Sequence, residues 1–343
     1  MSLRITGKLP SGKHLEKLRR SPNYKNGAFQ NLSPTPMKPD DISYWKMTRE
    51  FFKKHKDRLP AGLLPTVKTD LFKLDSSQPL IIWFGHSSYL IRIENKNFLV
   101  DPVLSGNAAP LSFMVKAFPG SNIYKPEDMP VIDYLILTHD HYDHLDFKTI
   151  RELRSKFDKV YCSLGIGSHL EYWGVDSDKI TEMDWWQTQR LSENVLLTAA
   201  PARHFSGRGI KRGQTLWSSF ILKTKGNNLY LGGDSGYDSH FKEIGIRYGP
   251  FDLAILEAGQ YNTMWPLIHM MPEETVQAAV DLEAKALFPV HWGKFTLSMH
   301  AWKDPVTRVL AKAEQVNMKV VTPKIGQPLI LTDSFESEAW WDS

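Results

Sequence analysis

The side chains best suited to chemistry in this sequence lie in one short segment, which reads His-Asp-His-Tyr-Asp-His over residues 139–144. His139 and His141 alternate as residues of an extended segment do, so both imidazoles can point the same way, and Asp143 and His144 follow at a turn. Neutral imidazole and carboxylate are the ligands of zinc and of similar divalent ions. The segment therefore predicts a metal site, with a polar surface loop as the alternative interpretation.

Four ligands cannot fill the coordination spheres of two metals, so further ligands must come from elsewhere in the chain. Three candidates follow short apolar runs and stand beside glycine or small residues: His204, Asp234 and His291. Taken singly, each is more often an ordinary polar turn residue. Taken in this order after the 139–144 segment, they form a specific set.

This order of motifs resembles the metallo-β-lactamase superfamily and, within it, the N-acyl-phosphatidylethanolamine-hydrolysing phospholipase D group. The likeness covers about residues 75–330 and leaves the preceding arm unmatched. The matching segments beyond the 139–146 region lie at residues 83–88, 101–102, 184–186, 216–217, 233–237, 247–253 and 291–293.

The resemblance implies an α+β fold, a four-layer αβ/βα sandwich of two mixed β-sheets flanked by helices, with two divalent metal ions at one edge. Zn²⁺ is the expected metal, with Fe or Mn as alternatives. By the same resemblance, one ion is held by His139, His141 and His204, the other by Asp143, His144 and His291, and Asp234 bridges both.

Three residues outside the ligand set receive roles from the resemblance. His269 corresponds to a histidine near the scissile phosphate, so the expected catalytic residues are Asp143, Asp234 and His269. Asp101 would accept a hydrogen bond from a ligand histidine and orient its ring, and His86 could do the same. Without the resemblance, packing as structural histidines is an equal alternative for His269 and His86.

Two adjacent divalent ions can share one water and lower its pKa towards 7, which generates a hydroxide nucleophile between them. The sequence therefore predicts a binuclear hydrolase, namely a phosphodiesterase of phospholipase D type acting on N-acyl-phosphatidylethanolamine-like lipids. A lactonase or a soluble phosphodiesterase on a small-molecule substrate is the first alternative. A nuclease, a non-catalytic binding module and a di-iron redox enzyme rank lower, because related di-iron enzymes carry Glu where His141 stands and add a flavin domain.

Charge is distributed unevenly along the 343 residues. Residues 1–60 hold 14 Lys and Arg against 5 Asp and Glu, a net charge of +9, whereas the remainder carries −5. We divide the chain into a basic N-terminal arm, residues 1–60, and a single hydrolase domain, residues 61–343. The arm is predicted to be irregular over residues 1–40 and helical over 41–59, a pattern in which Phe51 and Phe52 take part. It could approach an anionic membrane surface, while the acidic body gives no reason to expect nucleic acid.

Other features bear on location and partners. Cys162 is the only cysteine, so no intrachain disulfide can form, and a cytoplasmic protein is expected. No apolar run reaches the roughly 18 residues that span a bilayer. Two apolar loops, 110–120 and 261–271, could line an acyl groove, face a membrane or pack in a homodimer.

Periodicity predicts alternating strands and helices after residue 80. The predicted strands are 80–84, 89–93, 97–100, 133–137, 195–199, 216–224, 228–231, 252–256 and 286–290. The predicted helices are 147–157, 238–247, 272–283 and 304–316.

Overall fold

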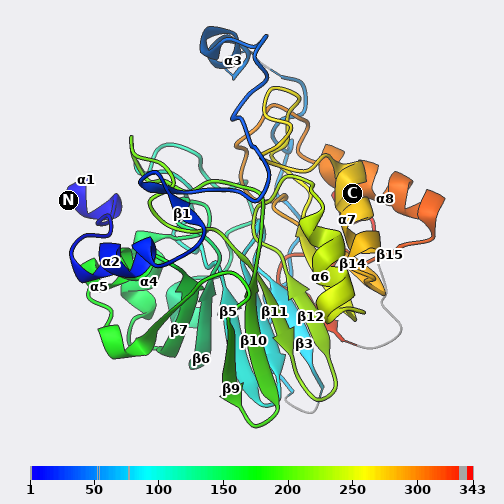
Figure 1. The fold of residues 1–343 in the computed structure, drawn as a ribbon. Coiled ribbons are helices and arrows are strands. Elements are labelled where there is room, and N and C mark those ends of the chain that lie inside the picture. The colour runs from blue at the N-terminus through cyan, green and yellow to red at the C-terminus, as the bar shows by residue number, and fades with distance from the viewer. Residues whose placement is uncertain (1, 52, 54, 76–77, 332–337, 343) are drawn as a thin grey trace.

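The structure is a computed structural model that describes residues 2–51, 53, 55–75, 78–331 and 338–342. Two mixed β-sheets of seven strands each lie face to face, with helices on both outer faces (Figure 1). The fold is therefore the predicted α+β sandwich of four layers.

The first sheet has the strand order β16-β3-β4-β5-β6-β7-β8. Its strands are β3 (Leu80–Trp83), β4 (Tyr89–Ile93), β5 (Lys96–Val100), β6 (Ile132–Leu137), β7 (Phe157–Ser163), β8 (Ile180–Met183) and β16 (Pro328–Ile330). The second sheet has the order β15-β14-β13-β12-β11-β10-β9. Its strands are β9 (Thr188–Ser192), β10 (Val195–Ala200), β11 (Ser219–Lys223), β12 (Asn228–Leu231), β13 (Leu253–Glu257), β14 (Ala286–Val290) and β15 (Lys319–Val320).

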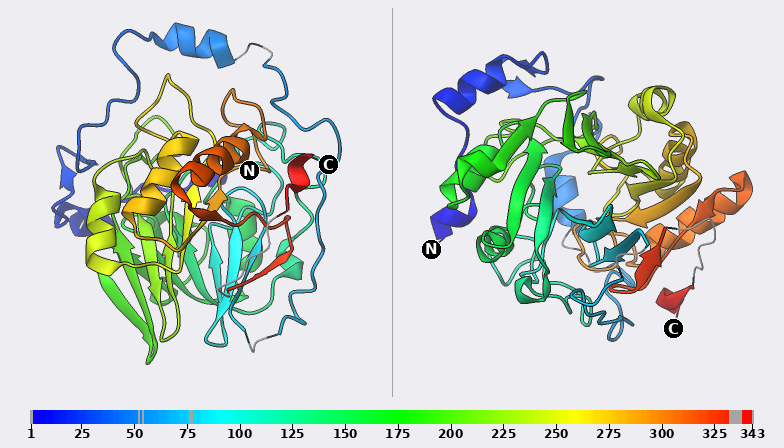
Figure 2. Two further views of the ribbon diagram at one scale, coloured as in Figure 1. Left: turned by 90° about the vertical axis from the view of Figure 1, so that its right-hand side faces the viewer. Right: turned by 90° about the horizontal axis from the view of Figure 1, so that it is seen from below.

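Side chains of β3 show how the layers arise, because successive residues of a strand point to opposite faces of the sheet. Ile81 and Trp83 pack between the two sheets, in a cluster that also holds Phe220 of the second sheet. Leu80 and Ile82 face the other way and pack under α4 (Phe147–Leu153) and α5 (Gly167–Tyr172). The second sheet is covered in the same manner by α6 (His240–Tyr248), α7 (Pro272–Asp281) and α8 (Asp304–Val316), as a turned view also shows (Figure 2).

One edge of the sandwich collects the predicted site residues. In the first sheet β5 and β6 run in the same direction as β3, and in the second sheet β12, β13 and β14 run in the same direction as β10. Contacts of Asp234, after β12, with His139 and His144, after β6, show that these strand ends of both sheets meet at the same edge. This edge receives the predicted ligands together with His86 after β3 and Asp101 after β5.

The first 51 residues are more ordered than predicted. Over residues 2–40, predicted to be irregular, they form α1 (Ser2–Ile5), α2 (Lys13–Arg19) and the hairpin β1 (Tyr24–Lys25) and β2 (Ala28–Phe29), and the helix predicted over 41–59 is present as the shorter α3 (Tyr44–Phe51). Helix α3 ends at Phe51, and Phe52 lies outside the described residues. Leu18 and Phe29 are buried against the domain beside Trp217, and this burial stabilises a segment whose own composition favours disorder.

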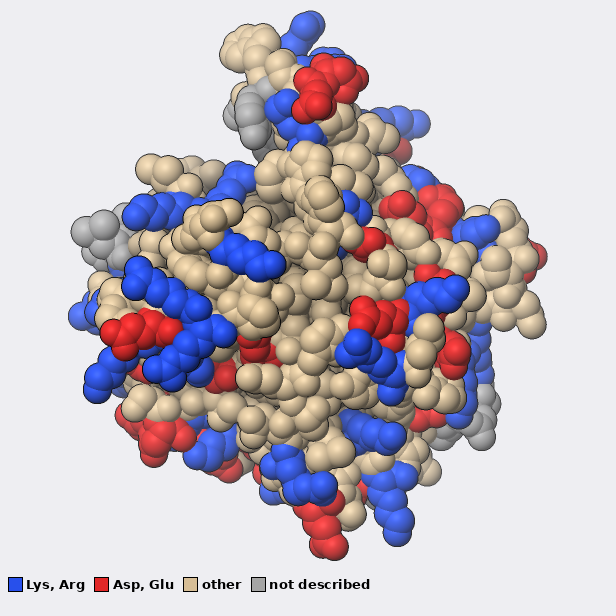
Figure 3. Space-filling model, in the orientation of Figure 1, with Lys and Arg blue, Asp and Glu red and all other residues tan. Residues whose placement is uncertain are grey.

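Charge on the arm is also partly balanced by the domain. Lys17 pairs with Glu182 at 3.0 Å and His14 lies 3.1 Å from Glu171. Lys and Arg gather over α1 and α2, with Asp and Glu interspersed (Figure 3). Some basic side chains of the arm thus pair with acidic side chains of the domain.

Another prediction was wrong at the segment after residue 147. The expected helix 147–157 ends at Leu153, and Phe157 already begins strand β7, which pairs in parallel with β6. Charged residues at 158 and 159 hide the strand pattern, and pairing with β6 supplies what local propensity lacks. Strands β8, β9 and β16 were likewise not predicted. In the described parts of the chain, no helix combines the length and apolarity needed to cross a membrane.

Candidate metal centre

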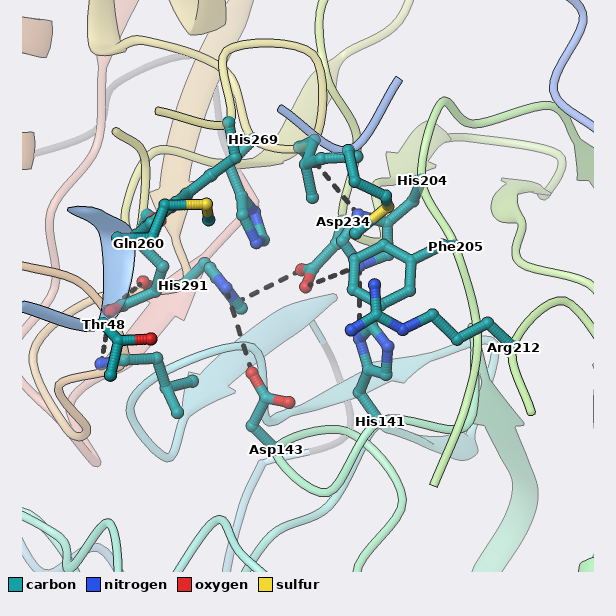
Figure 4. A pocket seen from close by; sticks show the side chains of 15 residues that line it. Thr48, His141, Asp143, His204, Phe205, Arg212, Asp234, Gln260, His269 and His291 are labelled. Atoms are coloured by element: carbon teal, nitrogen blue, oxygen red, sulfur yellow. Dashed lines mark hydrogen bonds and ion pairs between the residues drawn. The ribbon is translucent and has the colours of Figure 1, made fainter. Parts of the chain in front are cut away.

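Four side chains from three different loops meet in a first group at the sheet edge. His139 Nε2 lies 3.0 Å from His141 Nδ1, and His204 Nε2 lies 3.2 Å from that same atom. Asp234 Oδ2 lies 3.6 Å from His139 Nε2 and 3.7 Å from His204 Nε2. Ligand atoms of this group all lie within 4.8 Å of one another, as the close-up of the pocket in part displays (Figure 4).

A second group adjoins the first through Asp234. His144 Nε2 lies 3.1 Å from Asp234 Oδ1 and 3.6 Å from Asp143 Oδ2. His291 Nε2 lies 3.9 Å from Asp143 Oδ2. His86 also belongs to this compact group, and its Nε2 donates to Asp143 Oδ2 at 3.0 Å. The structure therefore brings all seven predicted ligands together and adds His86 beside them.

The bonding state of these atoms tests whether a metal fits. His144 Nε2, His291 Nε2 and Asp234 Oδ1 are buried and have no hydrogen-bond partner of acceptable geometry among the described residues. Leaving buried polar atoms unpaired costs about 1–3 kcal/mol each. His144 Nε2 lies 3.1 Å from Asp234 Oδ1, and His291 shares a compact group with His144, so these unpaired atoms fit a divalent cation, for which imidazole with carboxylate is the appropriate donor set.

Hydrogen bonds to the far side of each ring orient the histidines. His144 Nδ1 donates to Asp101 Oδ2 at 2.8 Å, and His204 Nδ1 donates to the Ile268 carbonyl at 3.0 Å. Both bonds leave the Nε2 side of the ring directed at the cluster. Asp101 also accepts from the backbone N–H and the hydroxyl of Thr138, so its own position is fixed. Asp101 thus occupies the orienting position predicted for it.

Backbone geometry at this edge is unusual. His86, Asp101 and His291 all have φ between 40° and 67°, the left-handed region that non-glycine residues rarely adopt. Such conformations cost about 1–3 kcal/mol each and persist where the surroundings impose them. Gly233 allows close packing at the same edge. A Cβ at this position would lie 2.9 Å from Thr138 Cβ and would separate Asp234 from the 139–144 turn.

Burial and charge set the protonation of the cluster. Burial lowers the pKa of His139, His204 and His291 well below the ordinary value, so these rings are neutral and can bind a metal. At His144 burial also opposes the charge, yet the carboxylates of Asp234 and Asp143 raise its pKa well above the ordinary value. The two carboxylates thus favour a positive charge between the side chains of the second group.

His269 lies beside the cluster with a partner that the sequence did not reveal. Its Nδ1 donates to Glu257 Oε2 at 2.6 Å, and its ring centre is 5.1 Å from that of His204. Burial opposes protonation of His269, but Glu257 raises the pKa of the imidazole to about 9. Burial raises the pKa of Glu257 to about 7. His269 is therefore the proton-bearing member of this pair in neutral solution.

Glu257 ends the buried strand β13, and its other oxygen accepts from the backbone N–H groups of Ser235 and Met270. A carboxylate at the end of an otherwise apolar strand was the available signal for it. Asp234, Glu257, His269 and His291 form a third compact group of possible ligands.

Arg208 is a second residue that the sequence analysis missed. Only 4% of Arg208 is exposed, and its guanidinium donates to the carbonyl of Asp140, within the ligand turn, at 2.7 Å and to that of Leu145, directly after it, at 2.8 Å. It also donates to the Ile5 carbonyl at 2.8 Å. The N-terminal segment is therefore tied to the metal-binding turn through one buried cation.

A cavity of about 500 Å³ opens onto the cluster. Its wall is mostly apolar and includes Met47 of α3, Trp265, Ile268 and Leu297. Arg212 also lines it and lies over the Phe205 ring at 5.0 Å, and no carboxylate of the described residues pairs with it (Figure 4). Of the two predicted apolar loops, 261–271 thus lines this cavity, while 110–120 does not.

Two mixed sheets with His and Asp clusters at one edge form a sandwich of the metallo-β-lactamase type, with groups of side chains that could hold metal ions. Residues 96–292 match the family described as the beta-lactamase superfamily domain, and the chain belongs to that family. The predicted resemblance is therefore confirmed.

Relatives agree with this assignment. An uncharacterized protein of Mycobacterium tuberculosis is 39% identical over 330 residues, which cover 94% of this chain and 88% of the relative. N-acyl-phosphatidylethanolamine-hydrolyzing phospholipase D 1 of Caenorhabditis elegans is 30% identical over 63% of this chain and 64% of its own length. The solved structure of Igni18, a metallo hydrolase of Ignicoccus hospitalis, is similar in fold, with a TM-score of 0.56 at 17% identity over 76% of this chain and all of its own.

Proposed function

We propose that the protein is a binuclear metal-dependent phosphodiesterase of phospholipase D type, acting on N-acyl-phosphatidylethanolamine-like lipids. The observation that carries the proposal is the convergence of unpaired buried donors from His144, His291 and Asp234 beside the His139, His141 and His204 group. One ion would lie in each group, with Asp234 between them. Zn²⁺ suits these donors, with Fe or Mn as alternatives.

Two such ions supply the lowered pKa of a shared water and the neutralisation of charge on phosphoryl oxygens. The chain's own residues supply the remainder. In hydrolysis the water gives one proton to solvent and its oxygen bonds to phosphorus, one phosphorus–oxygen ester bond breaks, and the departing alkoxide takes up a proton from a donor that solvent then reprotonates. His269 is the donor for that proton, because Glu257 holds it protonated with Nδ1 engaged and leaves Nε2 for the substrate.

The pocket favours an anionic, lipid-like substrate over a neutral lactone. Its apolar wall suits an acyl or alkyl group, and Arg212, which pairs with no carboxylate of the described residues, offers a cation to a phosphodiester. An uncharged lactone would leave Arg212 without a role. The 30% identity to a phospholipase D of this substrate class supports the same choice.

Peripheral contact with a membrane is part of the proposal. Helix α3 carries Lys46 and Arg49 and exposes 77% of Trp45, while its residue Met47 lines the cavity. An indole and basic side chains beside the mouth suit the interface of an anionic bilayer. A substrate lipid could then enter the pocket from the surface.

The test combines metal analysis with a substrate panel. We expect two divalent ions per chain, hydrolysis of bis(4-nitrophenyl) phosphate, and faster hydrolysis of N-acyl-phosphatidylethanolamine in anionic vesicles than of a soluble diester. Full activity of the metal-stripped protein would refute the hydrolase mechanism. A preference for γ-lactones over every diester would refute the substrate class.

A further inference from the structure

A second cavity of about 580 Å³ lies next to the first. Its outer wall consists of residues 28–35 of the N-terminal arm, and its inner wall includes Trp217. The two cavities share Met37, His204, Phe205 and Arg212, so they adjoin at these residues, one of which is a predicted metal ligand. The pocket at the metal cluster therefore has a second space next to it, beside His204.

The outer wall is built into the fold. Asn31 donates through Nδ2 to the His204 carbonyl at 2.8 Å, while its Oδ1 accepts from the His204 N–H at 3.1 Å. The same Oδ1 accepts from Trp217 Nε1 at 2.9 Å. Further along, Arg203 donates to the Pro34 carbonyl at 2.8 Å. One asparagine thus joins the arm to the backbone of a predicted ligand.

We infer that residues 28–37 form a binding site for the second organic substituent of a phosphodiester, an extended alkyl or acyl chain. This inference rests on the proposed function and specifies how the substrate is recognised. A diester carries one organic group on each side of phosphorus, and both need space once phosphorus lies at the cluster. Monoesters and lactones have no second group to place.

The residues shared by the two cavities suit a phosphodiester that places one substituent in each cavity. Arg212, which pairs with no described carboxylate, faces the position where the anionic phosphoryl group would join the two substituents. Phe205 lies beneath it, and Leu32 contributes an apolar wall to the second cavity. The second cavity thus suits a chain rather than another charged group.

The experiment measures binding of two diesters to the metal-loaded full-length protein by calorimetry. Dioctyl phosphate has a long chain on both sides, whereas octyl methyl phosphate has one. We expect dioctyl phosphate to bind at least about tenfold more tightly, because burial of the added methylenes is favourable. Leu32→Trp, which fills the second cavity, should remove this difference and leave binding of octyl methyl phosphate within about twofold of the wild-type value.

Leu63→Trp is the matched control, since Leu63 is 79% exposed and lines neither cavity. It should preserve the preference. Leu32→Tyr provides a second, smaller obstruction, with an intermediate loss expected. Equal affinity of the wild-type protein for both diesters, or a preference that survives Leu32→Trp, would overturn the inference while leaving diester hydrolysis untouched. Failure to bind or hydrolyse any diester would instead remove the proposed function itself.

Discussion

The metal cluster and the mouth of the pocket are built in opposite ways. The cluster consists of buried side chains at strand ends, with His144 and His291 wholly inaccessible and their rings hydrogen-bonded from behind. The mouth is assembled from the arm and from loops, where Trp45 is 77% and Leu32 is 55% exposed. This difference suggests that sheet edges determine the chemistry while the arm and loops determine which substrate reaches it.

The largest effect should follow from removing a ligand of the cluster. His204→Ala deletes one donor of the first group and should lower both the metal content and the rate on bis(4-nitrophenyl) phosphate by at least about 100-fold, more than loss of a partner behind a ligand. Metal analysis and steady-state kinetics on the same preparation check this. His14→Ala, which changes a partly exposed histidine outside the three compact groups, should alter neither. A His204→Ala protein that kept its full metal content and full rate would show that this cluster does not determine the chemistry.

A smaller effect is expected from substitution of a residue that hydrogen-bonds to a predicted ligand. Asp101→Asn keeps the size of the side chain but removes the charge that holds His144 Nδ1–H, and metal affinity should fall about 10- to 100-fold. Competition with a chelator measures this affinity without any substrate. Asp133→Asn is the control, because Asp133 pairs with Lys96 at the opposite end of the sheet. Equal affinities in the two variants would show that the hydrogen bond to His144 does not position the metal.

The smallest effect is expected from His269, which lies in the pocket wall beside the metal cluster, and from its partner Glu257. A general acid works only while protonated, so the wild-type rate should fall as pH rises through about 9, the pKa of His269. Glu257→Gln removes the charge that raises this pKa, so the basic limb of the kcat profile should move to lower pH. At pH 8 to 9 the rate should fall roughly tenfold relative to wild type.

Metal content should remain unchanged in Glu257→Gln, which distinguishes a role in the pocket wall from one in the cluster. If that variant lost metal instead, Glu257 would belong with the ligands, as its place in the third compact group allows. An unshifted pH profile with intact metal would remove His269 as the proton donor.

The secondary structure around the site was largely predictable, because apolar runs and turn residues mark most of the central strands. The exceptions share a cause. β7 carries Asp158 and Lys159 at exposed positions, so its pairing with β6 and β8 makes it a strand. The arm likewise gains its helices and hairpin by packing Leu18 and Phe29 onto the domain.

By itself, the sequence determined the local part of the site. Residues 139–144 lie so close together that their spacing alone implies a shared ligand, and the family motifs added His204, Asp234 and His291. Only the tertiary structure could decide that Glu257 meets His269, that Arg208 joins Ile5 to the ligand turn, and that Asn31 brings the arm against His204. These contacts join residues that lie from 12 to more than 200 positions apart, and their partners are chosen by packing of the sheets and the arm rather than by any local pattern.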